Sequence, residues 1–366
     1  MILKKCTMRK FSEYCGDKQI ACYGIGAEFE RIIKNYESYA WEDKICCLVD
    51  NSPKKKGTVA WVKDRAMTIL SLEQFLTRNP SEVVVLITCT AFNEIVEQLN
   101  RIPALDQVEC FIFHFMYSLS DGEFIQIRHT EEMLIPPVIH YCWFGGKELP
   151  DLYKRCIESW HKYCPGYEIK EWNETNCDIA ETNYTKQAYE AGKFAFVSDY
   201  FHLKVVFDHG GICLDTDVEA LKNLDDLRYN HAFCGLQSPG LANFGLGFGA
   251  EKGHEVVRSL MQCYKTIDFV KQDGSFDETP SPVYQTQDLV RLGMRPGPCA
   301  QAVKGVEIYP IEVLSPKNPL TEELCITEYS YTLHHYSGSW ATGEFLERIT
   351  LKKEYAKKLQ TLFDKG

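Results

Sequence analysis

The sequence lacks a long apolar run, a secretory leader and an excess of positive charge. Its longest apolar stretch, Val83 to Phe92, is shorter than the ~18 residues of a membrane-crossing helix and is predicted to be a buried strand. The N-terminal segment MILKKCTMRKFSEYC is mixed basic and polar, without the apolar centre of a signal peptide. A net charge of -11 argues against a nucleic-acid partner, because such a partner requires a concentrated basic face.

Cysteine is plentiful, but the Cys-x-x-Cys spacing of zinc and redox sites is absent. The 16 cysteines are scattered, and several lie in apolar strand-like runs where a thiol serves as a small hydrophobic side chain. These features predict a soluble, reduced, cytoplasmic protein, with peripheral association at the inner membrane face as a second interpretation. At 366 residues and 45% apolar composition, the chain is long enough for two domains with their own cores.

The most informative stretch runs from Lys193 to Glu219. It predicts a mostly apolar helix over Phe194 to Asp208, a glycine stop, a short strand and then the triplet Asp215-Thr216-Asp217. Alternate side chains of an extended strand point the same way, so these two aspartates are predicted to share one face. Paired carboxylates suit a hard divalent cation that completes its shell with water and phosphate oxygens. A surface turn is the alternative interpretation of the triplet.

Residues 1–125 alternate short apolar strands with helices, which predicts a Rossmann-like, doubly wound parallel sheet. Gly24 and Gly26 follow the first of the paired strands, and Asp50 follows the next, as at the start of a dinucleotide-binding unit. Phe29 stands where a third glycine is expected. These residues predict a nucleotide or nucleotide-sugar site, unless the glycines and the aspartate only form the turns that the fold needs.

Residues 126–137, which include a proline pair, are predicted to be a linker to a second α/β domain over residues 138–345. Trp143 follows the first strand of that domain, where its ring can stack on a flat base or belong to the core. On the central helix, Asp199 and His202 share one face. Asp199 is predicted either to meet a sugar or ribose hydroxyl or to make a structural hydrogen bond.

Two histidines near the C-terminus lie in a predicted strand, so His334 and His335 should point to opposite faces. A neutral imidazole is a good third ligand for a borderline cation, although both side chains can equally be core or surface histidines. The last segment, residues 346–366, predicts a helix with an apolar side and several lysines. It is expected to pack against the protein, or else to contact an anionic membrane that carries a lipid-linked acceptor.

Five motifs occur in a fixed order: IPPVIHYCWFGG, EWNE, AFVSDYFHL, GGICLDTDVE and LHHYSGSW. Over about residues 135–345 the chain resembles the DxD-containing sugar-binding region of bacterial capsular-polysaccharide glycosyltransferases related to the yeast initiating α-1,6-mannosyltransferase. It is more distantly similar to the glucosylating domains of large clostridial toxins. The resemblance implies a GT-A fold, a nucleotide-sugar donor, a Mn²⁺ or Mg²⁺ ion and retention of the anomeric configuration.

Positions that match the family pattern imply three groups of residues. The catalytic group is Asp199, Asp215 and Asp217. The implied metal ligands are Asp215, Asp217 and His335. The implied donor-binding residues are Trp143, Phe144, Asp199, His202, Asn243 and, from a loop that closes over the donor, Trp340. His202 departs from the pattern, because relatives carry arginine there.

The sequence therefore predicts a retaining, metal-dependent glycosyltransferase that moves a hexose to a glycan or lipid-linked oligosaccharide acceptor in surface polysaccharide synthesis. A UDP-linked donor is expected from its frequency in the family. Two other classes stay open. One is a nicotinamide-dependent oxidoreductase that uses the N-terminal domain. The other is a nucleotide-sugar-binding protein without transfer activity, as the loss of the family arginine at His202 would allow.

Overall fold

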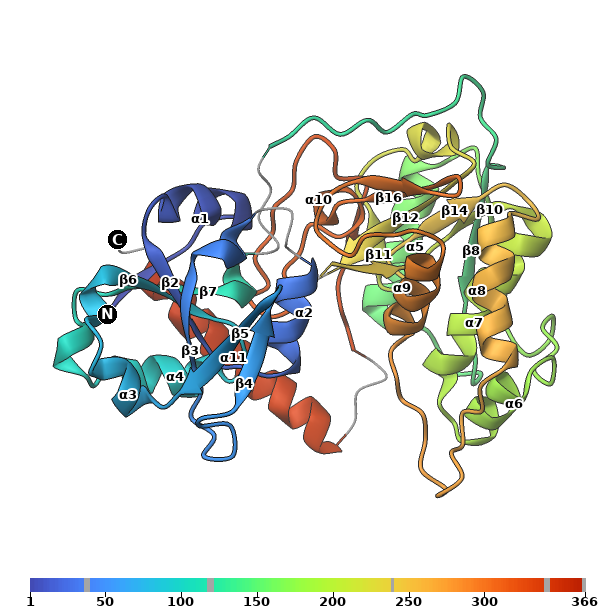
Figure 1. The fold of residues 1–366 in the computed structure, drawn as a ribbon. Helices are drawn as coiled ribbons and strands as arrows, with labels where there is room; N and C mark the ends of the chain where they lie inside the picture. The colour runs from blue at the N-terminus through green and yellow to red at the C-terminus, as the bar shows by residue number, and fades with distance from the viewer. Residues whose placement is uncertain (36–39, 117–121, 238–239, 339–342, 364–366) are drawn as a thin grey trace. The chain divides into compact units, whose positions relative to one another are not determined.

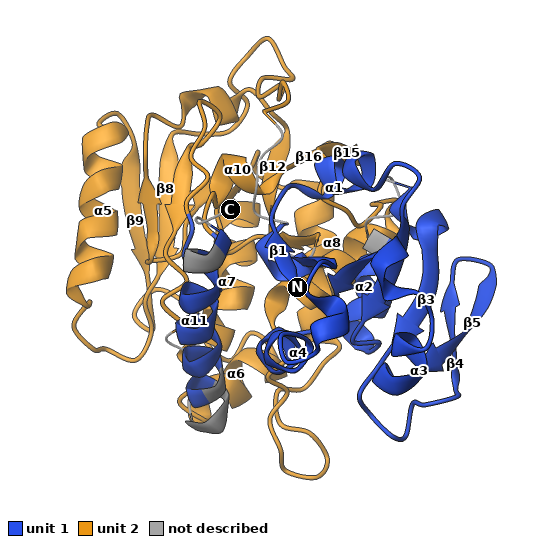
Figure 2. Ribbon diagram, turned by 90° about the vertical axis from the view of Figure 1, so that its left-hand side faces the viewer, with its two compact units in different colours: residues 1–121, 318–323, 343–366 blue, residues 122–317, 324–342 orange. Residues whose placement is uncertain are grey.

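The computed structural model describes the chain except residues 36–39, 117–121, 238–239, 339–342 and 364–366 (Figure 1). It divides into two compact units (Figure 2). Unit 1 comprises residues 1–121, 318–323 and 343–366. Unit 2 comprises residues 122–317 and 324–342. Both are α/β units whose main sheets contain parallel pairs, so the predicted α/β class with parallel sheets is confirmed.

Unit 1 is built on a sheet that extends in both directions from β2. In spatial order its strands are β1 (Ile2–Lys4), β7 (Glu109–Ile112), β6 (Val83–Ile87), β2 (Gln19–Tyr23), β3 (Ile45–Val49), β5 (Arg65–Leu70) and β4 (Val59–Val62). All neighbours pair in parallel except β4, which is antiparallel to β5. The chain adds β3 and β5 on one side of β2 and then β6 and β7 on the other, which is a doubly wound order.

The helices of unit 1 are α1 (Met8–Cys15), α2 (Ala27–Asn35), α3 (Leu72–Leu76), α4 (Phe92–Leu99) and α11 (Gly343–Phe363). The last of these is the helix predicted over residues 346–366. Its Ala356 and Leu359 are buried in the same cluster as Val85 and Ile112 of the sheet. The apolar side of α11 therefore belongs to the core of unit 1, and contact of this helix with a membrane is not supported. Among the residues that the structure describes, no helix is long and apolar enough to cross a bilayer.

The main sheet of unit 2 mixes parallel and antiparallel pairs. Its strands in spatial order are β15 (Gln301–Val303), β16 (Val306–Tyr309), β12 (Ala232–Gln237), β14 (Phe248–Ala250), β10 (Gly211–Cys213), β8 (Val138–Cys142) and β9 (Glu168–Trp172), with β13 (Leu241–Asn243) paired to β12. A separate antiparallel pair joins β11 (Val218–Ala220) to β17 (Thr332–His334). Strand β14 runs against both β10 and β12, so β10 and β12 run in the same direction.

The helices of unit 2 are α5 (Asp151–Tyr163), α6 (Asn183–Glu190), α7 (Phe194–His209), α8 (Glu255–Lys265), α9 (Ser281–Arg291) and α10 (Ile311–Leu314). Helix α7 is apolar around most of its circumference, which is typical of a helix buried on several sides. It ends at His209, and the two glycines that follow, Gly210 and Gly211, have φ 69° and 112°, conformations that favour glycine. A Cβ at Gly211 would lie 2.8 Å from the carbonyl oxygen of Val138, so only glycine allows β10 to start this close to β8.

Candidate functional site

The Asp-x-Asp triplet lies in a turn between two strands. Strand β10 ends at Cys213, and the amide of Val218 donates a hydrogen bond of 3.0 Å to the carbonyl oxygen of Asp215. The extended conformation expected for the triplet is therefore wrong, because the chain reverses here to pair β11 with β17. The turn nevertheless gathers Asp215 and Asp217 with His334, whose possible ligand atoms all lie within 4.8 Å of one another.

The histidine that joins the two aspartates is His334, whereas the family pattern points to His335. In the antiparallel pair, His334 stands opposite Val218, and its Nε2 lies 3.0 Å from Oδ1 of Asp217. The next residue points to the other face, where Nε2 of His335 lies 3.0 Å from Oε2 of Glu219. Strand alternation allows only one of the two imidazoles to reach the aspartates, and the register of β17 on β11 selects His334.

Asp217 is held by groups on the segment that follows β17. The amide of Ser337 donates a hydrogen bond of 2.8 Å to Oδ2, while His334 contacts Oδ1. Burial alone would raise the pKa of Asp217, but the charge and hydrogen bond of His334 and the Ser337 amide lower it below the usual range. The pKa of His334 is raised, because Asp217 outweighs the opposing effect of burial. Together these contacts keep the Asp217 carboxylate charged and fixed in orientation.

Asp215 faces a different histidine on α7. Nε2 of His202 lies 3.3 Å from Oδ1 of Asp215, and His202 is 4% exposed. Burial lowers the pKa of His202, so the imidazole is neutral at physiological pH despite the neighbouring carboxylate. The pKa of Asp215 is raised by burial and by the charge of Asp217, with both His202 and His334 opposing the rise. His202, for which the family pattern implies arginine, thus contacts the first aspartate of the triplet.

Gly245 packs directly against this carboxylate. A Cβ at Gly245 would lie 2.8 Å from Oδ2 of Asp215 and 3.1 Å from Oδ1 of Asn243. Asn243 accepts a hydrogen bond of 2.6 Å from the Gly245 amide and donates one of 2.7 Å to Oε1 of Gln237. Asn243 therefore orients the loop beside Asp215 and is itself 7% exposed. Sequence reasoning named Asn243 but missed Gly245, for which the only available signal was its position in the glycine-rich run LANFGLGFGA.

The residue Asp199 as a whole is half-buried, but its carboxyl group is fully buried next to α9. Burial raises the pKa of Asp199 to about 8; a hydrogen bond with Ser281 opposes the rise and the charge of Asp215 adds to it. Asp199 is thus electrostatically coupled to the Asp215 end of the site, and it faces Ser281 at the start of α9. Ser281 is a contact that sequence reasoning missed.

The aromatic residues predicted for donor binding have different surroundings. Trp143 is half-buried after β8, donates a hydrogen bond of 2.6 Å from Nε1 to the carbonyl oxygen of Lys147, and meets the ring of Tyr153 edge-on. Phe144 is 4% exposed, and its ring centroid lies 5.4 Å from that of Phe201 on α7. Phe144 is therefore a core residue. Trp340 lies outside the described residues.

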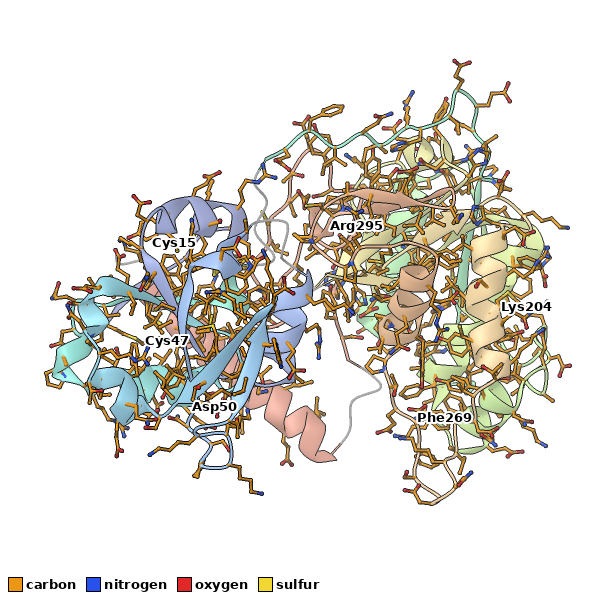
Figure 3. The ribbon with its side chains drawn as sticks, in the orientation of Figure 1. Cys15, Cys47, Asp50, Lys204, Phe269 and Arg295 are labelled. Atoms are coloured by element: carbon orange, nitrogen blue, oxygen red, sulfur yellow. The ribbon has the colours of Figure 1, made fainter. Side chains whose placement is uncertain are left out.

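The predicted nucleotide-binding residues of unit 1 are occupied by contacts with one another. Oδ2 of Asp50 (labelled in Figure 3) accepts a hydrogen bond of 2.8 Å from the amide of Ile25, and Oδ1 accepts one of 2.8 Å from Ser52. Nζ of Lys55 lies 3.0 Å from Oδ2 of Asp50 and 2.5 Å from the carbonyl oxygen of Ile25. The acidic residue that would bind a ribose is thus 8% exposed and serves to fix the glycine turn.

The glycines of that turn are also explained by internal packing. Gly24 has φ 97°, and a Cβ there would overlap the side chain of Cys89, which follows β6. A Cβ at Gly26 would lie 3.5 Å from Nζ of Lys55. The lysine ammonium therefore stands where a phosphate would approach the glycine turn in a dinucleotide-binding unit.

The match to a known protein family lies in unit 2, which contains the two aspartates of the triplet. Residues 150–234 match the family described as "Glycosyltransferase sugar-binding region containing DXD motif". This sugar-binding region includes both aspartates of the triplet, whereas His334 lies beyond its matched end. A curated relative, "Inositol phosphoceramide mannosyltransferase 3" of Schizosaccharomyces pombe, is 30% identical over an alignment of 148 residues that covers 37% of this chain and 40% of that protein. Together they support a glycosyltransferase.

The matches cover only part of the molecules compared. The chain spans 40% of the length of the curated relative. Among solved structures, "PaToxG Glycosyltransferase" matches 43% of this chain and 69% of its own length. The identity is 16% and the TM-score is 0.35. An aspartate semialdehyde dehydrogenase II from Vibrio cholerae covers 80% of the chain at 12% identity, over 68% of its own length, with a TM-score of 0.22. At these TM-scores, neither structure bears on the fold or function of this chain.

Proposed function

We propose that the chain is a metal-dependent glycosyltransferase that moves a hexose from a nucleotide sugar to a glycan acceptor. In this proposal unit 2 is a GT-A domain and unit 1 a Rossmann-like accessory domain. The observation that carries it is the cluster of Asp215, Asp217 and His334 after strand β10, because two of its three members lie in the matched sugar-binding region. The curated relative is named a mannosyltransferase, which supports transfer of a hexose.

The residues of the cluster fit a divalent cation. Carboxylate oxygens suit Mg²⁺ and Mn²⁺, and an imidazole ligand shifts the preference toward Mn²⁺. Nδ1 of His334 is buried and has no hydrogen-bond partner among the described residues, so the ring can shift toward a cation without breaking a second hydrogen bond. When bound, such a cation offsets the charge that develops on the diphosphate leaving group. His334 thus takes the place that the sequence interpretation gave to His335.

The remaining roles follow from where each side chain lies. Asp217 would bind the cation directly, because the Ser337 amide orients its carboxylate and each oxygen keeps a lone pair for the metal. Asp215, oriented by His202 and by close contact with Gly245, would face the donor sugar and ribose. Asp199 would bind a donor hydroxyl, and Trp143 would stack on the base from the end of β8. Asn243 would shape the loop beside the donor sugar without direct contact.

Three further parts of the proposal rest on the sequence resemblance. They are retention of the anomeric configuration, closure of Trp340 over the donor, and a cytoplasmic role in surface polysaccharide synthesis. A UDP-linked hexose stays the preferred donor, and the name of the curated relative adds a mannosyl donor as the second choice.

The test is a panel of UDP- and GDP-linked sugars screened for Mn²⁺-dependent hydrolysis and transfer. Wild type should release nucleotide from one donor, and Asp217→Asn should lower the rate at least about 100-fold, because it removes a charged ligand from the metal. Asp151→Asn, which changes a carboxylate of the same unit whose side chain is 93% exposed, is the matched control and should keep the wild-type rate. Equal rates for Asp217→Asn and wild type would contradict the proposal. Binding of a donor without turnover of any kind would favour the inactive binding protein.

The oxidoreductase alternative makes a separate prediction. It requires NAD to bind at the glycine turn of unit 1, where Asp50 and Lys55 already pair at 3.0 Å. NAD binding by wild type, lost in Asp50→Ala, together with full activity of Asp217→Asn, would support that alternative.

A further inference from the structure

Tyr153 connects two parts of the candidate site that are far apart in the sequence. Its hydroxyl oxygen lies 2.8 Å from Oγ of Ser337, and its ring meets that of Trp143 edge-on, with 5.6 Å between the ring centroids. Ser337 is also the residue whose amide donates a hydrogen bond to Oδ2 of Asp217. Tyr153 is 5% exposed. One buried side chain thus contacts both the proposed stacking residue and the segment that holds the metal carboxylate.

Helix α5 places Tyr153 at this position through its buried face. Tyr153 and Trp160 are about two helical turns apart, so they lie on one side of the helix, and both are buried. Nε1 of Trp160 donates a hydrogen bond of 2.8 Å to the carbonyl oxygen of Val218, the residue after Asp217. This bond anchors α5 beside the triplet, and Tyr153 reaches Ser337 from the same anchored face.

The direction of the hydrogen bonds follows from the charge of Asp217. Burial raises the pKa of Asp217 and His334 lowers it; the amide and the hydroxyl of Ser337 lower it further. A carboxylate cannot donate, so the single hydroxyl proton of Ser337 faces Asp217 and the Ser337 oxygen accepts the proton of Tyr153. The two hydroxyls form a chain that ends on the carboxylate, in which each bond polarises the next.

The segment that carries Ser337 bends back over Asp217. The amide of His335 donates a hydrogen bond of 3.0 Å to the main-chain carbonyl oxygen of Asp217. Tyr336 then takes a left-handed conformation with φ 53°, which is unfavourable for a residue with a Cβ. This turn brings Ser337 to the Asp217 carboxylate. Ser337 itself is exposed, so the hydrogen bond with Tyr153 ties an exposed residue to the protein interior.

We propose that Tyr153 is a positioning residue of the cation site. Its hydroxyl orients Ser337 and, through Ser337, the Asp217 carboxylate, while its ring supports Trp143 beside a nucleotide base. This inference rests on the proposed function, because it takes Asp217 as a metal ligand and Trp143 as the residue that stacks on the base. Loss of the hydroxyl should therefore weaken cation binding, and loss of the ring should also weaken donor binding.

Two substitutions separate the two contacts of Tyr153. Tyr153→Phe removes the hydroxyl and keeps the ring edge against Trp143. Tyr153→Leu removes both contacts and keeps a buried apolar side chain. Tyr163→Phe is the matched control at the other end of α5, about 15 Å away by helix rise. It removes a tyrosine hydroxyl whose partner is Nζ of Lys162.

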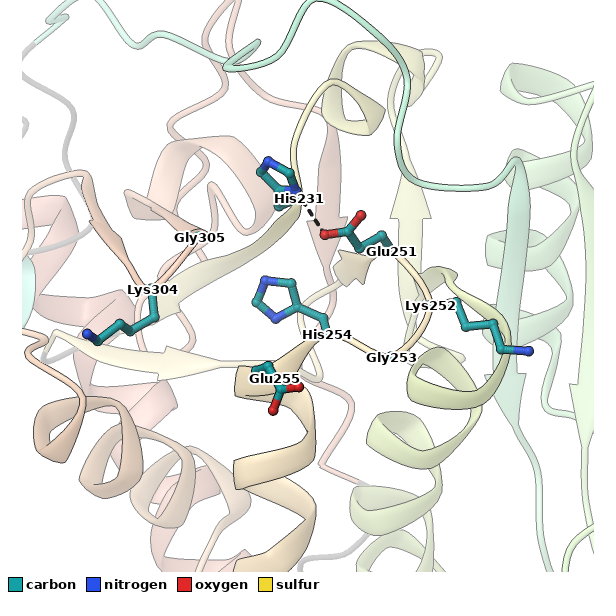
Figure 4. A pocket seen from close by; sticks show the side chains of 8 residues that line it. All are labelled: His231, Glu251, Lys252, Gly253, His254, Glu255, Lys304 and Gly305. Carbon is teal, nitrogen blue, oxygen red and sulfur yellow. Dashed lines mark hydrogen bonds and ion pairs between the residues drawn. The ribbon is translucent and has the colours of Figure 1, made fainter.

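A second control covers weak Mn²⁺ binding elsewhere on unit 2. Nδ1 of His231 lies 2.8 Å from Oε1 of Glu251 in an open hollow beside the start of α8, where both side chains can contact an added cation (Figure 4). His231 precedes β12, whose start is at the edge of the main sheet opposite to the end of β10. His231→Asn removes one of these two side chains and should leave the affinity of the carboxylate cluster unchanged.

The first readout is the affinity for Mn²⁺ without any nucleotide, measured from the EPR signal of free Mn²⁺. Wild type, Tyr163→Phe and His231→Asn should bind alike. Both Tyr153 variants should bind about tenfold more weakly, the lower end of the effect expected when a residue that orients a metal ligand is lost.

The second readout is donor hydrolysis at increasing Mn²⁺ concentration. In Tyr153→Phe the half-saturating Mn²⁺ concentration should rise about tenfold, while kcat and the donor KM at saturating Mn²⁺ stay near the wild-type values. Tyr153→Leu should in addition raise the donor KM, because Trp143 loses its supporting ring. Recovery at high Mn²⁺ distinguishes a weakened cation site from a general loss of folded protein.

The outcomes separate this inference from the proposed function. Wild-type Mn²⁺ affinity in Tyr153→Phe would overturn the inference and leave the proposed function intact. Absence of Mn²⁺ binding by wild type would contradict both. Weak binding by Tyr153→Phe together with a lower thermal unfolding midpoint, and without recovery of hydrolysis at high Mn²⁺, would show a structural role only and would also overturn the inference.

Discussion

Acidification should destabilise unit 2 through His140, a buried histidine of β8. Its Nε2 donates a hydrogen bond of 2.8 Å to the carbonyl oxygen of Gly210, and its Nδ1 accepts one of 3.0 Å from Nε1 of Trp172. Only the neutral ring can make both bonds at once, because a second proton on Nδ1 would face the indole N–H of Trp172. Burial lowers the pKa of His140 from 6.5 to about 4; the bond to Gly210 opposes this, and the charge of His209 adds to it.

The size of the effect follows from the two pKa values. The folded state keeps His140 neutral down to about pH 4, whereas the unfolded chain takes up a proton near pH 6.5, so stability falls as the pH falls between these values. The difference of about 2.5 pKa units, at about 1.36 kcal/mol each, corresponds to about 3 kcal/mol. About 2 kcal/mol of this should already be lost at pH 5, where the unfolded ring is almost fully protonated.

The assay is urea unfolding of wild type and His140→Gln at pH 7.5, 6 and 5, followed by tryptophan fluorescence, to which Trp172 contributes. Glutamine supplies a neutral donor and acceptor but cannot titrate. The stability advantage of wild type over the variant should shrink by about 2 kcal/mol between pH 7.5 and 5. Burial also lowers the pKa of His114 in unit 1 to about 4, but that effect is common to both proteins and cancels in the difference. A constant difference across this range would refute the reasoning.

Three other changes test the site and the core. His334→Ala should weaken Mn²⁺ binding at least about tenfold, as measured by the Mn²⁺ EPR signal, whereas His335→Ala should leave it near wild type; the reverse order would restore the family-based assignment. Gly245→Ala should lower donor turnover without changing the unfolding midpoint, because its Cβ would meet Asp215 at 2.8 Å in a loop at the site. Leu359→Ala should lower the free energy of unfolding of unit 1 by about 2–5 kcal/mol in urea titrations, since this side chain is 3% exposed in the core; a change below about 1 kcal/mol would place α11 outside that core.

The strands of the central sheets were predictable because buried parallel strands are short, nearly continuous apolar runs. Runs of this kind predicted strands over Gln19–Tyr23, Ile45–Val49 and Glu82–Thr88, which match β2, β3 and β6 to within one residue at each end. The wider apolar run Val83 to Phe92 continues past the end of β6 to the start of α4. The location of α11 was not predictable in the same way. Its apolar side is visible in the sequence, but its partners Val85 and Ile112 lie more than 200 positions away, and periodicity does not specify which core an amphipathic helix joins.

The sequence predicted which residue types form the candidate site, but it did not predict which of the two adjacent histidines faces the aspartates. The adjacent histidines and strand alternation show that one imidazole turns toward the aspartates, and nothing local says which one. Pairing of His334 with Val218 decides it, and that pairing joins segments more than 110 positions apart. Gly245 was missed for a related reason. Gly245 has an ordinary φ and must be glycine only because the Asp215 carboxylate lies so close to it. The sequence around Gly245 does not show this, because Asp215 belongs to another segment of the chain.

The same long-range pairing makes the carboxylate cluster a property of the whole of unit 2. The matched sugar-binding region ends at residue 234 and supplies Asp215 and Asp217, but the contacts that fix Asp217 come from His334 and Ser337. Without them a carboxylate that is 6% exposed would lose its partners, and burial would then favour its protonated form over the charged one. Docking of β17 on β11 is therefore the step that turns a pair of aspartates into a site able to hold a cation.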